Sequence, residues 1–122
     1  QIQGFPTFFQ AAPNLVKAAL SLNNTQTTKI HSGLICTGDQ FITSRTELDT
    51  IKTTFPQGLA VDMESCAIAH TCHIYGVPFV SFRIISDIPL KDNKAQQYFD
   101  FWEKISDNSF NVTKSFLEKL TS

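Results

Sequence analysis

Two acidic residues that follow apolar, strand-like runs are the candidates for chemistry in this sequence. Glu64 lies in the stretch 61–65 (VDMES), and Asp87 ends the stretch 83–87 (RIISD). Open α/β sheets bind their ligands at the carboxyl ends of strands, which is where both acids are expected. Burying a carboxylate is costly unless something binds it. Two carboxyls converging on one pocket suit glycosidic-bond cleavage, in which one handles the leaving group and the other stabilises the sugar cation.

The composition is that of a globular protein of single-domain size. The chain has 122 residues, of which 42% are hydrophobic, and eleven of them are Phe. A net charge of −1 gives no electrostatic reason to expect nucleic acid or an anionic membrane as partner. No apolar run approaches the roughly 20 residues that a membrane span needs. The first residues show neither a signal-peptide pattern nor an initiator Met, which indicates that the sequence begins within a longer protein.

The cysteines predict a reducing compartment and no metal site. Three Cys form no disulfide framework, and an odd count fits reduced thiols in a cytoplasmic protein. Cys66, His70 and His73 share one helical stripe (i, i+4, i+7), as metal ligands can. No fourth ligand is evident, so we interpret the cysteines as small apolar side chains and expect no bound metal.

The order of the predicted elements indicates an α/β fold. Ser44 and Glu47 form a capping box in front of one helix, and Gly76 with Pro78 ends another. The predicted elements are a helix over 13–22, a strand over 30–37, a helix over 45–54, a strand over 59–62, a helix over 64–75, a strand over 77–85, a polar segment over 91–97 and an amphipathic helix over 99–120. Strands that alternate with helices favour parallel pairing.

Three strands are too few for a parallel sheet that is covered on both faces. We therefore interpret residues 1–122 as the C-terminal half of one larger α/β domain, with no internal boundary.

Three motifs in order resemble one enzyme family. They are 33–41 (GLICTGDQF), 61–65 (VDMES) and 77–87 (VPFVSFRIISD). Together they resemble the bacterial 5′-methylthioadenosine/S-adenosylhomocysteine nucleosidases of the purine nucleoside phosphorylase superfamily. The resemblance runs through essentially the whole sequence and covers the C-terminal half of the family's usual chain. It implies part of a three-layer α/β/α domain with a mixed, mostly parallel sheet, assembled as a homodimer.

The resemblance implies hydrolysis of the bond between adenine N9 and ribose C1′ of a small nucleoside. Asp87 corresponds to the acid that protonates adenine N7, and Ser86 helps to orient the base. Met63 and Glu64 correspond to the ribose contacts, and the charge of Glu64 would stabilise an oxocarbenium-like transition state. No metal or organic cofactor is implied, because protonation and electrostatics suffice for this cleavage.

The remaining contacts implied by the resemblance surround the adenine and the alkylthio group. Phe41 corresponds to a residue that stacks on adenine, and the backbone of Ile42 to one that reads its Watson–Crick edge. Arg83 corresponds to the family's basic residue near the pocket. Phe99 corresponds to the aromatic residue that closes over the alkylthio group.

Each of these assignments also has a simpler structural interpretation. An acid that follows a strand commonly caps a helix, and a residue such as Phe41 is commonly part of a core. Arg83 could pair with a structural carboxylate. Tyr98 and Phe101 compete with Phe99 for its assigned role.

The sequence also departs from the family pattern. The family's water-activating glutamate belongs to the N-terminal half, so we expect the 122 residues alone to be inactive. Gln3 replaces a frequent Pro in a segment donated to the neighbouring subunit's site, Asp62 replaces the usual Glu, and Ser65 replaces the usual Ala. Two alternative functions remain open at this point: a phosphorolytic purine nucleoside phosphorylase, and a non-catalytic half-domain that binds nucleosides or dimerises.

Overall fold

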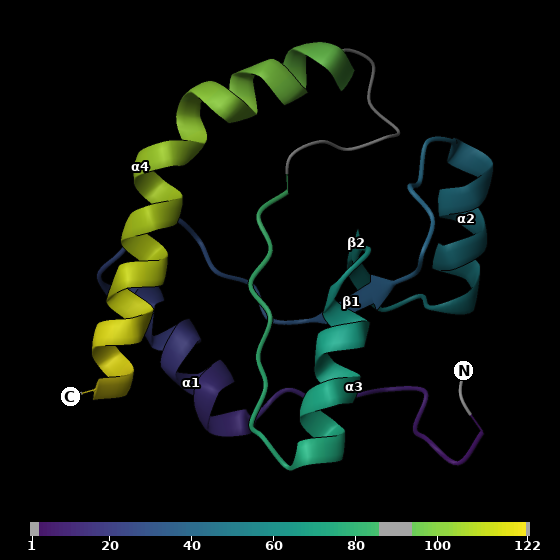
Figure 1. Ribbon diagram of the computed structural model, residues 1–122. Helices are drawn as coiled ribbons and strands as arrows, with labels where there is room; N and C mark the ends of the chain where they lie inside the picture. Colours follow the sequence, from purple (N-terminus) through teal and green to yellow (C-terminus); the bar gives the residue numbers. More distant parts are fainter. Residues whose placement is uncertain (1–2, 86–93, 122) are drawn as a thin grey trace.

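The computed structural model describes residues 3–85 and 94–121, and within the second range it omits the side chains of 94–98, 103–104 and 106–108. The chain forms helices on either side of a small parallel sheet (Figure 1). In chain order the elements are α1 (Pro13–Ser21), a 3₁₀ turn η1 (Leu22–Asn24), β1 (Leu34–Thr37), α2 (Arg45–Thr54), β2 (Gly58–Asp62), α3 (Ser65–Tyr75) and α4 (Lys94–Thr121).

The sheet of the described residues consists of β1 and β2, which run parallel. Parallel strands need a crossover connection, and α2 provides it. The register pairs Thr37 with Asp62, so the last residues of both strands lie side by side at one edge of the sheet. The backbone N–H of Gly38 donates to the Asp62 carbonyl at 3.2 Å and extends the pairing by one residue. This edge is where ligands of open α/β sheets bind.

The expected strand over 77–85 is not formed in the structure, although these residues are all described. The segment runs extended between α3 and α4 (Figure 1), but no β-ladder pairs it with β1 or β2. Its backbone link to α1 is a hydrogen bond from the N–H of Ala12 to the Phe79 carbonyl, at 2.7 Å. A β-branched, apolar sequence favours extension, but a strand also needs a neighbour for its hydrogen bonds.

Two other predicted boundaries were wrong. The strand expected over 30–37 is limited to 34–37, because only these residues pair with β2. The last helix begins at Lys94, so residues 94–97 of the expected polar segment are helical. Both errors concern element ends, which local sequence specifies weakly.

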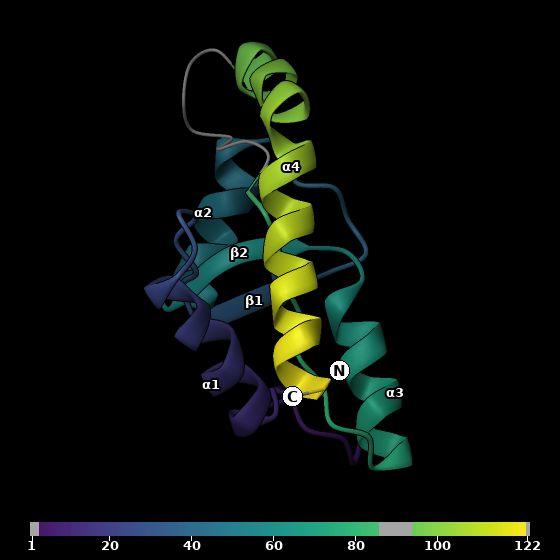
Figure 2. The same ribbon diagram turned by 90° about the vertical axis from the view of Figure 1, so that its left-hand side faces the viewer.

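The compact core lies between α1 and α4 rather than under the sheet. Ala19 and Leu22 pack against Val112 and Phe116, and the ring of Phe82 meets that of Phe116 with centroids 4.8 Å apart. Figure 2 shows the lower half of α4 crossing close to α1. Large apolar side chains of β2 are exposed instead: Leu59 is 60% exposed and Val61 is 36% exposed. The sheet therefore keeps much of its apolar surface uncovered.

Candidate functional site

The candidate site begins where β1 and β2 end. Thr37 is the last residue of β1 and Asp62 the last of β2, and α3 starts three residues further on at Ser65. The extended segment 77–85 passes the same edge and brings Ser81 and Arg83 to it. Four separate segments of the chain thus deliver polar side chains to one end of a two-stranded sheet.

The carboxylate of Asp62 is the centre of this group. Its Oδ1 accepts hydrogen bonds from Thr37 Oγ1 at 2.6 Å and from the Ser65 backbone N–H at 3.3 Å. Its Oδ2 accepts from Ser65 Oγ and from Arg83 Nε, the latter at 2.6 Å. The Asp62 side chain is only 6% exposed, so it depends on these donors in place of water. Ser65 Oγ also lies 2.8 Å from Ser81 Oγ.

Arg83 joins the buried acid to an exposed one. Its Nε contacts Asp62, and its Nη2 contacts Glu64 Oε2 at 2.7 Å. The Glu64 side chain is 62% exposed and projects from the sheet edge toward solvent. Although Glu64 occupies the N-cap position of α3, its side chain makes no capping hydrogen bond. Arg83 therefore pairs with a structural carboxylate, that of Asp62, and also with the Glu64 carboxylate that the resemblance assigned to ribose.

The pKa of Asp62 reflects two opposing influences. Burial raises the pKa of this carboxyl, whereas hydrogen bonds from Ser65, Thr37 and Arg83 lower it and together prevail. The pKa of Asp62 consequently lies below its ordinary value, and the group is ionised in the folded chain at neutral pH.

This lowered pKa predicts a loss of stability in acid. A carboxyl with a depressed folded-state pKa contributes stability above its unfolded-state pKa of about 4, and loses that contribution as pH falls through the folded value. The free energy of unfolding of the 122-residue chain should therefore fall below about pH 4. In an Asp62→Asn variant this fall should be shallower, as measured by urea unfolding at a series of pH values.

The matched control for this prediction is Asp49→Asn, in an exposed i, i+4 pair with Arg45 on α2. Glu47, whose pKa is lowered by hydrogen bonds from the backbone N–H groups of Thr43 and Ser44 and from the Ser44 hydroxyl, destabilises the fold in acid in the same direction. The test therefore compares how steeply the free energy of unfolding falls in acid for Asp62→Asn, Asp49→Asn and wild type. If the free energy of unfolding falls equally steeply with decreasing pH in Asp62→Asn and in wild type, Asp62 does not contribute to the acid sensitivity.

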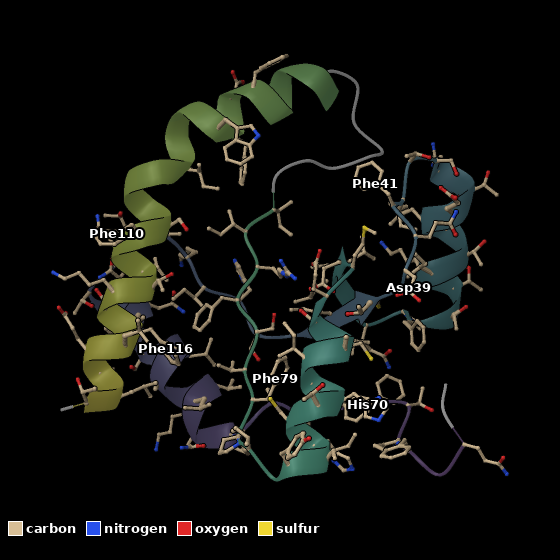
Figure 3. All side chains as sticks on the ribbon, viewed as in Figure 1. Asp39, Phe41, His70, Phe79, Phe110 and Phe116 are labelled. Atoms are coloured by element: carbon tan, nitrogen blue, oxygen red, sulfur yellow. The ribbon has the colours of Figure 1, made fainter. Side chains whose placement is uncertain are left out.

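The loop between β1 and α2 carries Phe41 and Ile42. The Glu47 carboxylate accepts hydrogen bonds from residues just before and just after these two. The predicted capping box is formed: Ser44 Oγ accepts from the Glu47 N–H at 3.2 Å, and Glu47 Oε2 accepts from the Ser44 N–H at 3.1 Å. Glu47 Oε1 also accepts a hydrogen bond from the Gln40 side chain. Figure 3 places Phe41 and Asp39 on this loop, on the α2 side of the molecule.

A large cavity adjoins the sheet edge. Its volume is about 1420 Å³, and Thr37, Ile42, Asp62 and Arg83 contribute to its lining. Ligand pockets usually measure about 300–1,000 Å³. The cavity extends from the site past β1 to α1 and α4, which its lining residues Ala19 and Val112 mark. It thus combines the site with interior space that the described residues do not fill.

The structure brings together some of the residues assigned from sequence and leaves others apart. Glu64 contacts Arg83, and Arg83 and Ile42 line the cavity, whereas Glu64 and Met63 do not. Phe41 is 67% exposed on its loop, and Phe99 is 65% exposed on α4. Neither of these two aromatic residues lines the cavity.

Ser86 and Asp87 lie outside the described residues. The described part of the segment that holds Ser81 and Arg83 ends at Ile85. The proposed pairing of Asp87 with adenine stays a prediction from its motif.

Sequence reasoning missed the hub formed by Asp62, Thr37, Ser65 and Ser81. It treated Asp62 and Ser65 only as mild departures from the family pattern, yet the two departures contact each other directly. A usable signal was present. Thr37 and Asp62 each end an apolar run, at the carboxyl end of a predicted strand, where open α/β sheets bind their ligands.

Metal ligation and membrane insertion find no support in the part of the chain that the structure describes. No group of three or more His, Cys, Asp or Glu there could hold a metal ion. His70 and His73 instead contact the rings of Phe5 and Phe9; the centroids of Phe5 and His70 are 4.5 Å apart. Figure 3 shows His70 on α3 facing the N-terminal segment. Among the described residues, no helix is long and apolar enough to cross a membrane.

Comparison with known proteins gives one consistent result. A family model described as the phosphorylase superfamily matches residues 1–118. A 5′-methylthioadenosine/S-adenosylhomocysteine nucleosidase from Pseudoalteromonas translucida is 39% identical over 123 residues, which cover 100% of this chain and 52% of the relative. The corresponding nucleosidase of Desulfotalea psychrophila is 36% identical, with 98% of this chain and 51% of the relative covered.

Solved structures agree. A Borrelia burgdorferi protein crystallised with adenine superimposes with a TM-score of 0.86 at 38% identity, over 97% of this chain and 51% of the other. The Neisseria meningitidis nucleosidase in complex with methylthio-immucillin-A gives a TM-score of 0.83 at 30% identity, over 96% and 51%. The chain spans about half the length of the curated relatives it matches. The expected partial α/β phosphorylase-like fold is confirmed, and the chain belongs to the phosphorylase superfamily, where it resembles the 5′-methylthioadenosine/S-adenosylhomocysteine nucleosidases.

Proposed function

We propose that this chain is the base- and ribose-facing half of a domain that hydrolyses the N-glycosidic bond of 5′-methylthioadenosine and S-adenosylhomocysteine. One observation carries the proposal: Arg83 holds the exposed carboxylate of Glu64 at the carboxyl edge of the β1–β2 sheet. Similar proteins with this fold were crystallised with adenine and with methylthio-immucillin-A. The products would be adenine and a 5-thioribose.

Glu64 would act on the sugar. As the C1′–N9 bond breaks, positive charge develops on the ribose ring, and a carboxylate beside it stabilises that charge. Glu64 would also accept hydrogen bonds from the ribose hydroxyls, next to Met63. The guanidinium of Arg83 donates a hydrogen bond to Glu64 Oε2 at 2.7 Å and restricts the orientation of this carboxylate.

Asp87 would act on the base. The electron pair of the breaking bond moves to adenine, and a proton delivered from Asp87 to N7 makes adenine a neutral leaving group. Ser86 would help to orient the base, Phe41 would stack on it, and the Ile42 backbone would read its edge. Phe99 would close over the alkylthio group. Water then adds its oxygen to C1′ and gives its proton to a base outside these 122 residues.

The relatives are about twice as long as this chain, so the rest of the site is proposed to come from their other half. That half would supply the water-activating glutamate and fill the uncovered face of the sheet. We expect the 122 residues alone to be inactive, and the full domain to work as a homodimer in the cytoplasm.

The test uses what we call the completed domain: the 122 residues joined behind the remaining half of the Pseudoalteromonas translucida relative. It should release adenine from both proposed substrates in phosphate-free buffer, as measured by liquid chromatography. A cooperative thermal transition, measured first, shows that the completed domain is folded.

The same assay separates the alternative functions. If a folded completed domain cleaves nucleosides only when phosphate is added, the protein is a phosphorylase. If it binds methylthioadenosine without cleaving it, the protein is a binding module. Futalosine belongs in the substrate panel, because a futalosine hydrolase from Helicobacter pylori superimposes with a TM-score of 0.81 at 26% identity.

A further inference from the structure

The buried carboxylate of Asp62 has no part in the mechanism above, yet it accepts four hydrogen bonds at the sheet edge. We infer that Asp62 is a positioning residue: it fixes the guanidinium of Arg83, which in turn orients the Glu64 carboxylate toward the sugar. The inference rests on the proposed function for its catalytic consequence. Its structural part, the dependence of Arg83 on Asp62, stands on the contacts alone.

The first step is that the orientation of Asp62 is itself determined. Oδ1 accepts from Thr37 at the end of β1 and from the N–H of Ser65 at the start of α3. Oδ2 accepts from the Ser65 hydroxyl and from Arg83. Donors on both oxygens, from different segments, leave the 6% exposed carboxylate one orientation that satisfies all of them.

The second step is that Asp62 determines where Arg83 points. Its planar guanidinium makes one contact at Nε, to buried Asp62, and another at Nη2, to exposed Glu64. An ion pair between two exposed, freely moving side chains is weak, so the geometry of the Arg83–Glu64 pair depends on what else holds Arg83. The buried, charge-assisted hydrogen bond is stronger. The Asp62 contact therefore anchors the guanidinium, and the Glu64 contact follows from it.

The third step is that an isosteric amide cannot replace Asp62. Asn has the same shape, but one of its two terminal atoms is an NH₂ donor. That group would face either the Thr37 hydroxyl and the Ser65 N–H, or the Ser65 hydroxyl and Arg83 Nε. In each case one N–H group, that of Ser65 or that of Arg83, loses its acceptor, whereas the hydroxyl can turn to accept from the NH₂ group. Because the negative charge is also lost, the orientation of Arg83 should become less restricted.

The first arm of the test observes Arg83 in the 122-residue chain. The Nε–H group of Arg83 gives its own ¹H–¹⁵N signal. Its exchange with water should accelerate about 10-fold or more in Asp62→Asn, because the charge-assisted hydrogen bond that protects it is lost. Asp49→Asn, a solvent-exposed acid on α2, is the matched control and should leave the signal unchanged. An unchanged Arg83 signal in Asp62→Asn overturns the inference.

The second arm is a double-mutant cycle in the completed domain. Asp62→Asn should lower kcat about 10- to 100-fold and change KM by less than about 3-fold, because misplacement of a catalytic group by about 1 Å costs up to about 10²-fold. Arg83→Lys removes the fork that joins the two acids. In the Arg83→Lys background, Asp62→Asn should then lower kcat by less than about 3-fold more, because its effect passes through Arg83.

The two experiments distinguish failure of the inference about Asp62 from failure of the proposed function. If the folded wild-type completed domain releases no adenine, the proposed function fails, whereas the Arg83 signal still reports on Asp62. If wild type is active and Asp62→Asn costs the same in both backgrounds, Asp62 has only a structural role. A cooperative thermal transition for every variant excludes unfolding as the cause.

Discussion

Replacing Asp87 by Asn in the completed domain is expected to lower the rate of adenine release from methylthioadenosine by about 10²–10⁴-fold, the usual contribution of a general acid. Adenine leaves poorly as an anion, and protonation at N7 removes that difficulty. Asn has nearly the shape of Asp but cannot deliver a proton. The measurement is steady-state adenine release by purified wild type and variant, matched for thermal stability.

A substrate with a better leaving group provides the control. p-Nitrophenyl riboside releases a phenolate that is stable near neutral pH and has no N7 to protonate. If the completed domain accepts this substrate, Asp87→Asn should cleave it at close to the wild-type rate. An equal loss on both substrates would mean that Asp87 supports the fold or the sugar and is not the acid.

Replacing Glu64 by Gln is expected to lower kcat by about 10²–10³-fold, comparable with the loss of one preorganised electrostatic contact to a transition state. Gln keeps the size of the side chain and one oxygen for Arg83, but it loses the charge that faces the ribose cation. Because both substrates pass through a ribose cation, the loss should be similar for methylthioadenosine and for p-nitrophenyl riboside. This pattern differs from that of Asp87→Asn.

The matched variant for Glu64 is Glu118→Gln, an exposed acid that pairs with Lys114 on α4, and it should leave kcat unchanged. Substrate binding should change much less than kcat in Glu64→Gln, since the charge acts on the transition state. A Glu64→Gln variant with wild-type kcat would remove Glu64 from the catalytic account.

Local signals in the sequence predicted the start of α2 and the end of α3. The Ser44–Glu47 capping box set the start of α2, and its predicted range of 45–54 matches the structure. Gly76 ends α3 in the left-handed conformation, with φ of 66°, which is what its place after the last helical residue indicated. These features depend on residues close to one another in the chain.

Long-range pairing was harder to predict. Residues 77–85 have strong strand propensity, but whether they form a ladder depends on a neighbouring strand, which propensity does not reveal. The same limit applies to the site. The sequence left open whether Arg83 pairs with a structural carboxylate and did not indicate which one. The hub at Asp62 requires four segments whose approach only the fold determines. The residue types signalled chemistry, and the topology decided which of them touch.

The most direct measurement of the central claim compares adenine release from methylthioadenosine by three samples in phosphate-free buffer. They are the 122-residue chain alone, the remaining half of the relative alone, and the completed domain. The account predicts adenine from the completed domain and none above background from either half, because Glu64 and Asp87 would lie in one half and the water-activating base in the other. Release by the 122-residue chain alone at the rate of the completed domain would contradict it.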